Sequence, residues 1–169
     1  QVRDLVKKIK KISKNSKFPV MIDEEGGAVS RLSKIINHNI SQKLFGDLYK
    51  FNKKFSIILY KSYINNLSKI LRDIGININT VPVLDVLTKN TSKIIGARSF
   101  SNKPIIVKEL GKKCVSNYEF NKIGTIIKHM PGHGCASSDS HLKLPKVKLS
   151  YKNLNKNHFL PFKKNPAKL

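Results

Sequence analysis

Residues 128–141, KHMPGHGCASSDSH, bring together side chains that can move protons and bind polar ligands. They include three histidines within thirteen residues, one lysine and one carboxylate. The carboxylate, Asp139, stands two residues before His141, near enough for it to orient the imidazole. Such a pair fixes the imidazole tautomer and raises its basicity, which makes the histidine a usable general acid/base near neutral pH. The segment therefore predicts a site of proton transfer.

Two other chemistries compete for this segment. Zinc binding by the three histidines would need the pair His129 and His133 to share one helix face, but Pro131 breaks any helix between them. A serine nucleophile could be Ser138 or Ser140, but no G-x-S-x-G motif supports it. We expect no metal here and keep both chemistries as weaker alternatives.

Polar residues also follow two apolar runs elsewhere in the chain. Residues 23–32, DEEGGAVSRL, place three acids before two glycines. These acids would repel a phosphate, whereas Asp23 can accept hydrogen bonds from sugar hydroxyls and Arg31 can bind a carboxylate or a hydroxyl. Residues 94–100, IIGARSF, add Arg98 in another loop. Taken alone, each segment is more typical of a solvated surface turn.

Helical and extended patterns alternate along the chain. Apolar residues recur at helical spacing in several segments, one ended by Gly75 and another opened by Pro104. Pro161 should shorten or kink the last helix. We predict helices at residues 2–12, 60–74, 104–120 and 151–164, and buried strands at residues 18–23, 76–86 and 123–129.

This alternation is typical of parallel βα units. Three strands are too few to close a barrel, which typically needs about 250 residues, but the polar residues follow the strands, where a barrel enzyme builds its site. We therefore predict the α/β class with an incomplete (β/α)8 TIM-type barrel, roughly its first half. Residues 1–169 would belong to one domain. A complete flavodoxin-like sheet is the alternative.

The chain is strongly basic. Thirty-three Lys and Arg against ten Asp and Glu give a formal charge of +23, which can bind a polyanion by releasing counterions. However, the excess is mostly lysine, spread from end to end with abundant Asn and Ile, as AT-rich codons produce. No RNA-binding, helix-turn-helix or zinc-finger pattern accompanies it. We predict no specific nucleic-acid partner, with a basic nucleic-acid-binding module as an alternative.

Features that bear on location and completeness are few. No run of about 18 apolar residues occurs, so we expect no membrane span. The two cysteines are too few for a disulfide framework and suit a reducing compartment, so we expect a cytoplasmic protein. The chain begins at Gln1 and stops at Leu169 without a terminal signature, and we expect a fragment of a longer protein.

Together these segments resemble glycoside hydrolase family 3, in its β-N-acetylglucosaminidase branch, which acts in bacterial cell-wall recycling. Four motifs carry the resemblance, in family order and over nearly the whole chain. They are similar to D-Q-E-G-G-R-V-x-R-L at residues 23–32, A-P-V-L-D-V at residues 81–86, G-D-R-S-F at residues 96–100, and K-H-F-P-G-H-G…D-S-H…L-P at residues 128–145.

The resemblance implies a partial N-terminal barrel domain of that family over residues 1–169. The implied reaction is retaining hydrolysis of terminal β-linked N-acetylglucosamine from muropeptide-type sugars, without a cofactor. His141 would be the general acid/base and Asp139 its orienting partner. The family's nucleophile, an aspartate on a later strand, would lie beyond Leu169. The implied sugar-binding residues are Asp23, Arg98, Lys128 and His129, with Arg31 a weaker candidate.

The sequence departs from the family pattern at several positions. Ala28 stands for the usual Arg and Ala97 for the usual Asp, so an ion pair or a substrate contact is absent. Glu24 replaces Gln, and Met130 replaces Phe, a change that preserves volume. These departures favour an alternative, a decayed and non-catalytic remnant. A β-glucosidase or β-xylosidase of the same family is another, although those branches lack the D-S-H loop.

Overall fold

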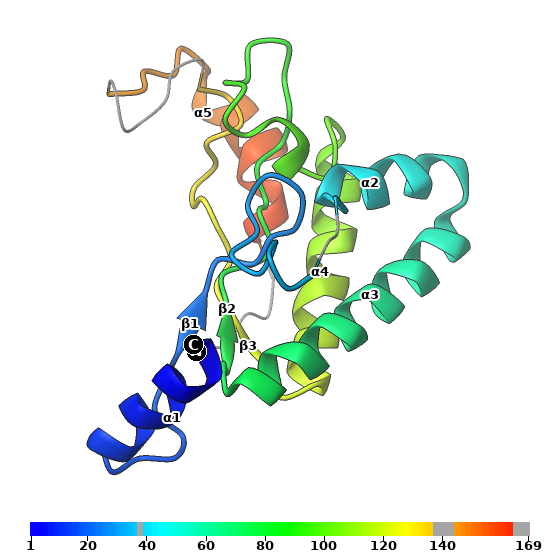
Figure 1. Cartoon of the computed structure of the whole chain (residues 1–169). Helices are drawn as coiled ribbons and strands as arrows, with labels where there is room; N and C mark the ends of the chain where they lie inside the picture. Colours follow the sequence, from blue (N-terminus) through cyan, green and yellow to red (C-terminus); the bar gives the residue numbers. More distant parts are fainter. Residues whose placement is uncertain (37–38, 137–143, 164–169) are drawn as a thin grey trace.

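The computed structural model of the chain describes residues 1–36, 39–136 and 144–163. Short strands alternate with helices along the chain (Figure 1). The elements are, in order, α1 (Val2–Ile12), β1 (Met21–Ile22), α2 (Gln42–Phe51), α3 (Lys53–Ile74), β2 (Ile78–Asn79), η1 (Gly96–Arg98), α4 (Pro104–Phe120), β3 (Gly124–Thr125), α5 (Tyr151–Asn153), η2 (Leu154–His158) and η3 (Leu160–Phe162).

The three strands form one parallel sheet in the order β1-β2-β3. They lie within the predicted strands but are much shorter. The ladder between the second and third strands is interrupted at Val81, whose N–H donates to Asn79 O of its own strand (2.9 Å). Pairing resumes directly beyond it, where Lys128 N donates to Pro82 O (3.1 Å), Leu84 N donates to Lys128 O (2.6 Å) and Val83 bridges Lys128 in parallel. The prediction was therefore right in place and direction and wrong in length.

The helices follow the predicted pattern with two corrections. Helices α1 and α4 have the predicted bounds, and α3 ends at Gly75 (φ 93°) as expected. However, α3 begins at Lys53 rather than at residue 60, and α2 was not predicted at all. Asn52 separates these two helices and caps the second, since its side chain accepts a hydrogen bond from Phe55 N. The predicted last helix splits into α5, the π turn η2 and the 3-10 turn η3, which contains Pro161.

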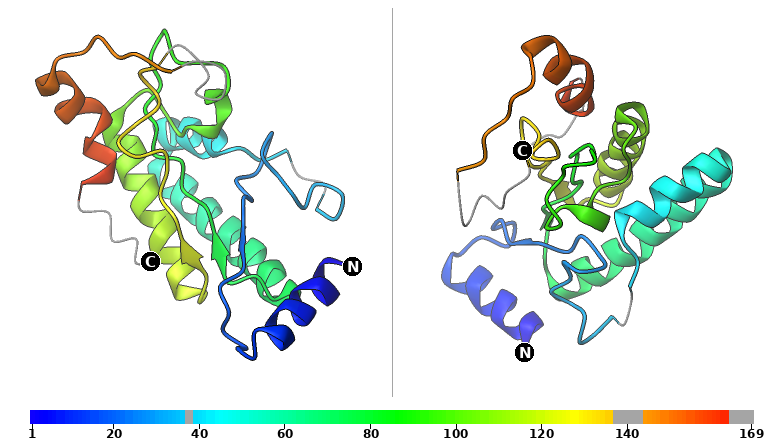
Figure 2. Two further views of the ribbon diagram at one scale, coloured as in Figure 1. Left: turned by 90° about the vertical axis from the view of Figure 1, so that its left-hand side faces the viewer. Right: turned by 90° about the horizontal axis from the view of Figure 1, so that it is seen from above.

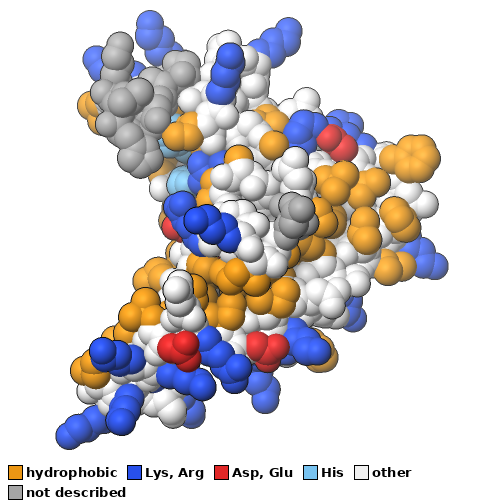
Figure 3. All heavy atoms as spheres, viewed as in Figure 1, with side chains coloured by type: hydrophobic (Ala, Val, Ile, Leu, Met, Phe, Trp, Pro, Cys, Tyr) orange, Lys and Arg blue, Asp and Glu red, His pale blue; other side chains and the backbone are white. Residues whose placement is uncertain are grey.

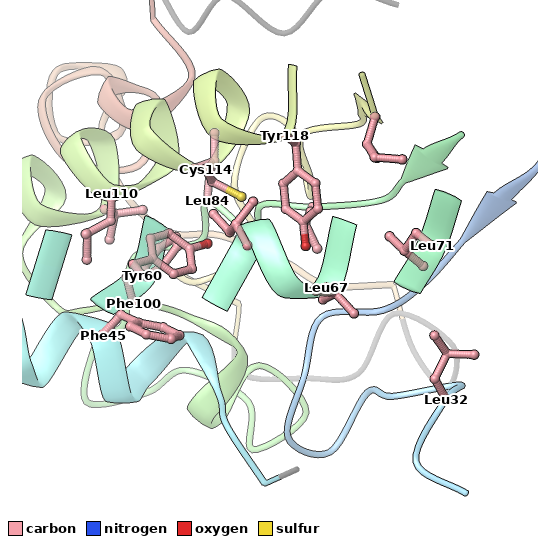
Figure 4. Close-up of a cluster of buried hydrophobic side chains, with 14 of the residues drawn as sticks. Leu32, Phe45, Tyr60, Leu67, Leu71, Leu84, Phe100, Leu110, Cys114 and Tyr118 are labelled. Atoms are coloured by element: carbon pink, nitrogen blue, oxygen red, sulfur yellow. The ribbon is translucent and has the colours of Figure 1, made fainter. Parts of the chain in front are cut away.

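Helices α3 and α4 lie side by side on one side of the sheet in two different views (Figures 1 and 2). Between them and the strands is the core, where Leu71, Leu84 and Leu110 are fully buried. Figure 4 shows Phe45, Tyr60 and Phe100 gathered at one end of this core. The Tyr60 ring centroid lies 4.4 Å from that of Phe45 and 5.7 Å from that of Phe100.

Lysine and arginine side chains are spread over the face seen in Figure 3 and do not gather in one patch on it. This distribution agrees with the interpretation of the charge as a compositional bias. Within the described ranges no helix is long and apolar enough to cross a membrane.

Candidate active site

Lys128 lies where the segments that follow the three strands meet. Because parallel strands end at the same edge of a sheet, Asp23, Thr80 and Lys128 are brought together from distant parts of the sequence. Lys128 Nζ lies 2.8 Å from Asp23 Oδ1 and donates to Thr80 Oγ1 at 3.0 Å. It also lies 2.6 Å from Glu25 Oε1. The Lys128 ammonium group therefore connects the segment after β1, through Asp23 and Glu25, to the segment after β2, through Thr80.

Glu25 connects Lys128 to Arg98. Its side chain is 1% exposed and forms a bidentate ion pair with the guanidinium, at 2.8 Å to Nε and 3.0 Å to Nη2. This hydrogen bonding raises the pKa of Arg98. A planar carboxylate and a planar guanidinium match in shape, so the pair fixes the orientation of Arg98 as well as its charge.

Asp85 orients His129. The Asp85 carboxylate is fully buried, and its Oδ2 lies 2.6 Å from His129 Nδ1, while Oδ1 accepts a hydrogen bond from His133 N. On the other side of the ring, His129 Nε2 lies 3.2 Å from Arg98 Nη2. Since a guanidinium can only donate, Nε2 is the acceptor and Nδ1 carries the proton given to Asp85. His129 is thus held in one tautomer between a carboxylate and a cation.

The loop after β1 turns back on itself so that its two adjacent glutamates have different partners. Gly26 has φ 86°, and a Cβ there would lie 2.2 Å from Ile40 O, so this position requires glycine. The buried Glu24 accepts hydrogen bonds from Arg31 N (2.8 Å) and Leu32 N (2.9 Å). Glu24 therefore holds the loop closed, whereas Glu25 faces the site.

Four of the predicted binding residues come together in this network: Asp23, Arg98, Lys128 and His129. Arg31 does not join it by a contact. Its side chain is exposed and acts on Asp23 only through its charge. Asp139 and His141 lie outside the described residues.

The prediction from sequence missed Glu25, Thr80 and Asp85. Each carries a polar group close to the end of a strand, and both acids lie within motifs that support the family resemblance. Their positions were therefore visible in the sequence, but their partners were not. The zinc alternative includes His141, which lies outside the described residues. Over residues 1–36, 39–136 and 144–163 no three or more His, Cys, Asp or Glu side chains are placed to hold a metal ion.

The pKa of Asp23 is lowered, chiefly by the hydrogen bond from Lys128 and then by that from Thr80. Because the folded pKa lies below its ordinary value of 3.8, Asp23 stabilises the fold above that value, and the contribution is lost as the pH falls through the folded pKa. We expect Lys128→Gln to raise the pKa of Asp23, as measured by ¹³C NMR of its carboxyl carbon. A wild-type value at or above 3.8 would contradict the contact with Lys128.

Comparison with known proteins shows one family. The model described as "Glycosyl hydrolase family 3 N terminal domain" matches residues 1–166. Beta-hexosaminidase A of Pseudoalteromonas piscicida is 34% identical over 146 residues, which are 85% of this chain and 24% of that protein. The chain thus spans about a quarter of that relative's length.

The fold is similar to solved structures of the same family. NagZ from Neisseria gonorrhoeae superposes with a TM-score of 0.87 at 26% identity, over 95% of this chain and 46% of NagZ. A complex of that NagZ with N-trifluoroacetyl-D-glucosamine gives the same TM-score over 47% of its chain. Zinc-bound CbsA from Thermotoga neapolitana has a TM-score of 0.82 at 28% identity, over 99% of this chain and 34% of CbsA.

These similarities confirm the prediction of a parallel α/β fold of the incomplete TIM-barrel type. They also confirm the resemblance inferred from the four motifs. The chain belongs to glycosyl hydrolase family 3, within its N-terminal domain.

Proposed function

We propose that the full-length protein containing this chain hydrolyses terminal β-linked N-acetylglucosamine, and that residues 1–169 form the first part of its barrel domain. The observation that carries the proposal is the cluster of Asp23, Lys128, Arg98 and His129 at the carboxyl edge of the sheet. Two buried carboxylates, on Glu25 and Asp85, hold this cluster in place. Relatives named beta-hexosaminidase support it, as does the NagZ complex with a glucosamine derivative.

The cluster suits a sugar because its groups are oriented before a ligand arrives. Asp23 is nearly half exposed, and both of its hydrogen bonds with described residues use Oδ1. Its Oδ2 can therefore accept hydrogen bonds from sugar hydroxyls. Lys128 and Arg98 are each 16% exposed and are held by their carboxylate partners, so their charges have fixed positions beside Asp23. Fixed donors and acceptors reduce the entropy lost on binding.

The proposed chemistry is retaining. An aspartate from a later part of the barrel would attack the anomeric carbon while His141 gives its proton to the leaving oxygen. His141 would then take a proton from the water that cleaves the glycosyl-enzyme. Asp139 would hold the imidazole in the correct orientation. This mechanism uses side chains alone and requires no cofactor.

The test is hydrolysis of 4-nitrophenyl glycosides by the full-length protein. We expect release of 4-nitrophenol from the β-N-acetylglucosaminide and little from the β-glucoside or β-xyloside. Preference for one of the latter would support another β-glycosidase of the family. Binding of N-acetylglucosamine without hydrolysis of any glycoside would support a non-catalytic remnant instead.

The natural substrate and its location belong to the same proposal. We propose a muropeptide-type sugar, on the motifs shared with the cell-wall branch, and a cytoplasmic location. The location is supported by Cys114 and Cys135, which are both free in the structure and suit a reducing compartment. Activity on N-acetylglucosaminyl-muramyl fragments, measured against chitobiose, would test the substrate.

A further inference from the structure

Gln42 links two parts of the site through backbone atoms, without a hydrogen bond to any of the proposed sugar-binding side chains. It is the first residue of α2 and is only 3% exposed. Its side-chain Nε2 donates to the backbone oxygen of Arg98, and its Oε1 accepts from Val83 N at 3.3 Å. One buried amide therefore fastens the Arg98 loop to the segment that leads to Asp85.

The Arg98 loop is also fitted closely against α2 and against that same segment. A Cβ on Gly46 would lie 1.7 Å from the backbone oxygen of Phe100, so glycine allows the helix and the loop to touch. Ser99 Oγ donates to Asp85 O at 2.5 Å. These contacts fix the loop near Arg98, and Gln42 supplies the one at the Arg98 backbone oxygen.

The position of the Arg98 backbone matters because its guanidinium serves two partners at once. It pairs with both oxygens of Glu25 and lies 3.2 Å from His129 Nε2. Val83, the other partner of Gln42, stands two residues before Asp85, which holds the opposite side of the His129 ring. A shift of either backbone segment would therefore change the setting of His129.

We propose that Gln42 is a positioning residue that sets Arg98 and Asp85 on either side of His129. It acts through Arg98 and Asp85 and not on the sugar. The effect of Gln42 on catalysis rests on the proposed function, whereas its effect on the position of Arg98 does not. A small displacement of binding groups can reduce catalysis by as much as about a hundredfold, which gives the scale of the expected effect.

The test compares Gln42→Met with Asn77→Leu in the full-length protein. Methionine matches glutamine in length but forms neither hydrogen bond. Asn77 is the control because its amide also uses both its oxygen and its nitrogen to bind backbone atoms, accepting from Val20 N (2.8 Å) and donating to Phe18 O (3.0 Å), both in the segment before β1. It lies just before β2, at the opposite end of the strands from the site.

The first measurement is the Arg98 Nε–H signal in ¹⁵N NMR without any ligand. We expect Gln42→Met to shift this signal and to speed its exchange with solvent, and Asn77→Leu to leave both unchanged. An unchanged signal in folded Gln42→Met, or an equal change in Asn77→Leu, would overturn the proposal. This arm decides the matter even if the full-length protein hydrolyses none of the glycosides.

The second measurement is kinetic. We expect kcat/KM of Gln42→Met to fall about 10- to 100-fold, with the control within about twofold of wild type. Should Gln42→Met fail to fold, Gln42→Glu replaces it in both measurements, since the ionised glutamate keeps the acceptor for Val83 N, loses the amide donor to Arg98 O and adds a negative charge beside that oxygen. A folded Gln42→Glu protein with the wild-type Arg98 signal and wild-type kcat/KM would also overturn the proposal.

Discussion

Glu25→Ala is expected to lower the free energy of unfolding by about 3–5 kcal/mol, as measured by urea denaturation. The carboxylate is 1% exposed and lies between two cations, Lys128 and Arg98, that are each 16% exposed. Without this carboxylate, the two largely buried cations would repel each other and would lose the anion that neutralises them. Lys128 keeps Asp23, so Arg98 bears most of the loss.

Asp47→Ala is the matched control for Glu25→Ala. Asp47 also contacts two cations, Lys43 and Lys50, but its side chain is 46% exposed. Ion pairs in water contribute little, so we expect a loss of at most about 1 kcal/mol. Equal losses in the two variants would show that burial does not strengthen the Glu25 pairs and would contradict the site described above.

His141→Ala is expected to reduce turnover of an N-acetylglucosaminide by about 10²- to 10⁴-fold in the full-length protein, the usual contribution of a general acid/base. The loss should depend on the leaving group. 4-Nitrophenolate leaves readily without a proton, whereas a sugar alkoxide does not. We therefore expect a larger loss with chitobiose than with the 4-nitrophenyl glycoside, measured as kcat/KM for each substrate.

Asp139→Asn supplies a graded comparison, because it keeps the shape of the side chain but weakens the orientation of the imidazole. Its effect should have the same dependence on the leaving group and be smaller than that of His141→Ala. A loss that is equal for both substrates would indicate that the histidine binds the sugar and does not transfer the proton. Wild-type turnover by His141→Ala would rule out the proposed dyad.

The sequence predicted the order and direction of the elements well, because apolar periodicity reports which faces are buried. The prediction of helix bounds failed where apolar residues are exposed. The stretch before residue 60 belongs to α3, but Phe55 and Ile58 there are 52% and 58% exposed, so they fall outside the core-facing stripe. The predicted strand length was wrong for another reason, since Val81 N bonds to Asn79 O in its own strand and so interrupts the ladder inside a run that otherwise resembles a strand.

The sequence indicated four residues that the structure brings together, Asp23, Arg98, Lys128 and His129, but not the network that joins them. Nothing in the pair Glu24-Glu25 shows that the first folds back onto Leu32 N while the second reaches Arg98, seventy-three residues away. That division depends on the backbone of the following glycines. Gln42 was missed because a single buried amide carries no periodic signal, and its partners are backbone atoms that every residue type possesses.

The described side chains of the site carry more negative than positive charge, whereas the whole chain is strongly basic. Among the described residues, Asp23 and Glu25 contact the two permanent cations Lys128 and Arg98, and Asp85 adds a third carboxylate beside His129, within a chain of formal charge +23. The overall field draws anions from a distance and weakens with salt, but the site has no surplus of positive charge to retain them. Attraction at long range and binding at the site thus have different causes: the net charge acts on any anion, whereas the described part of the site offers no excess of positive charge to bind one.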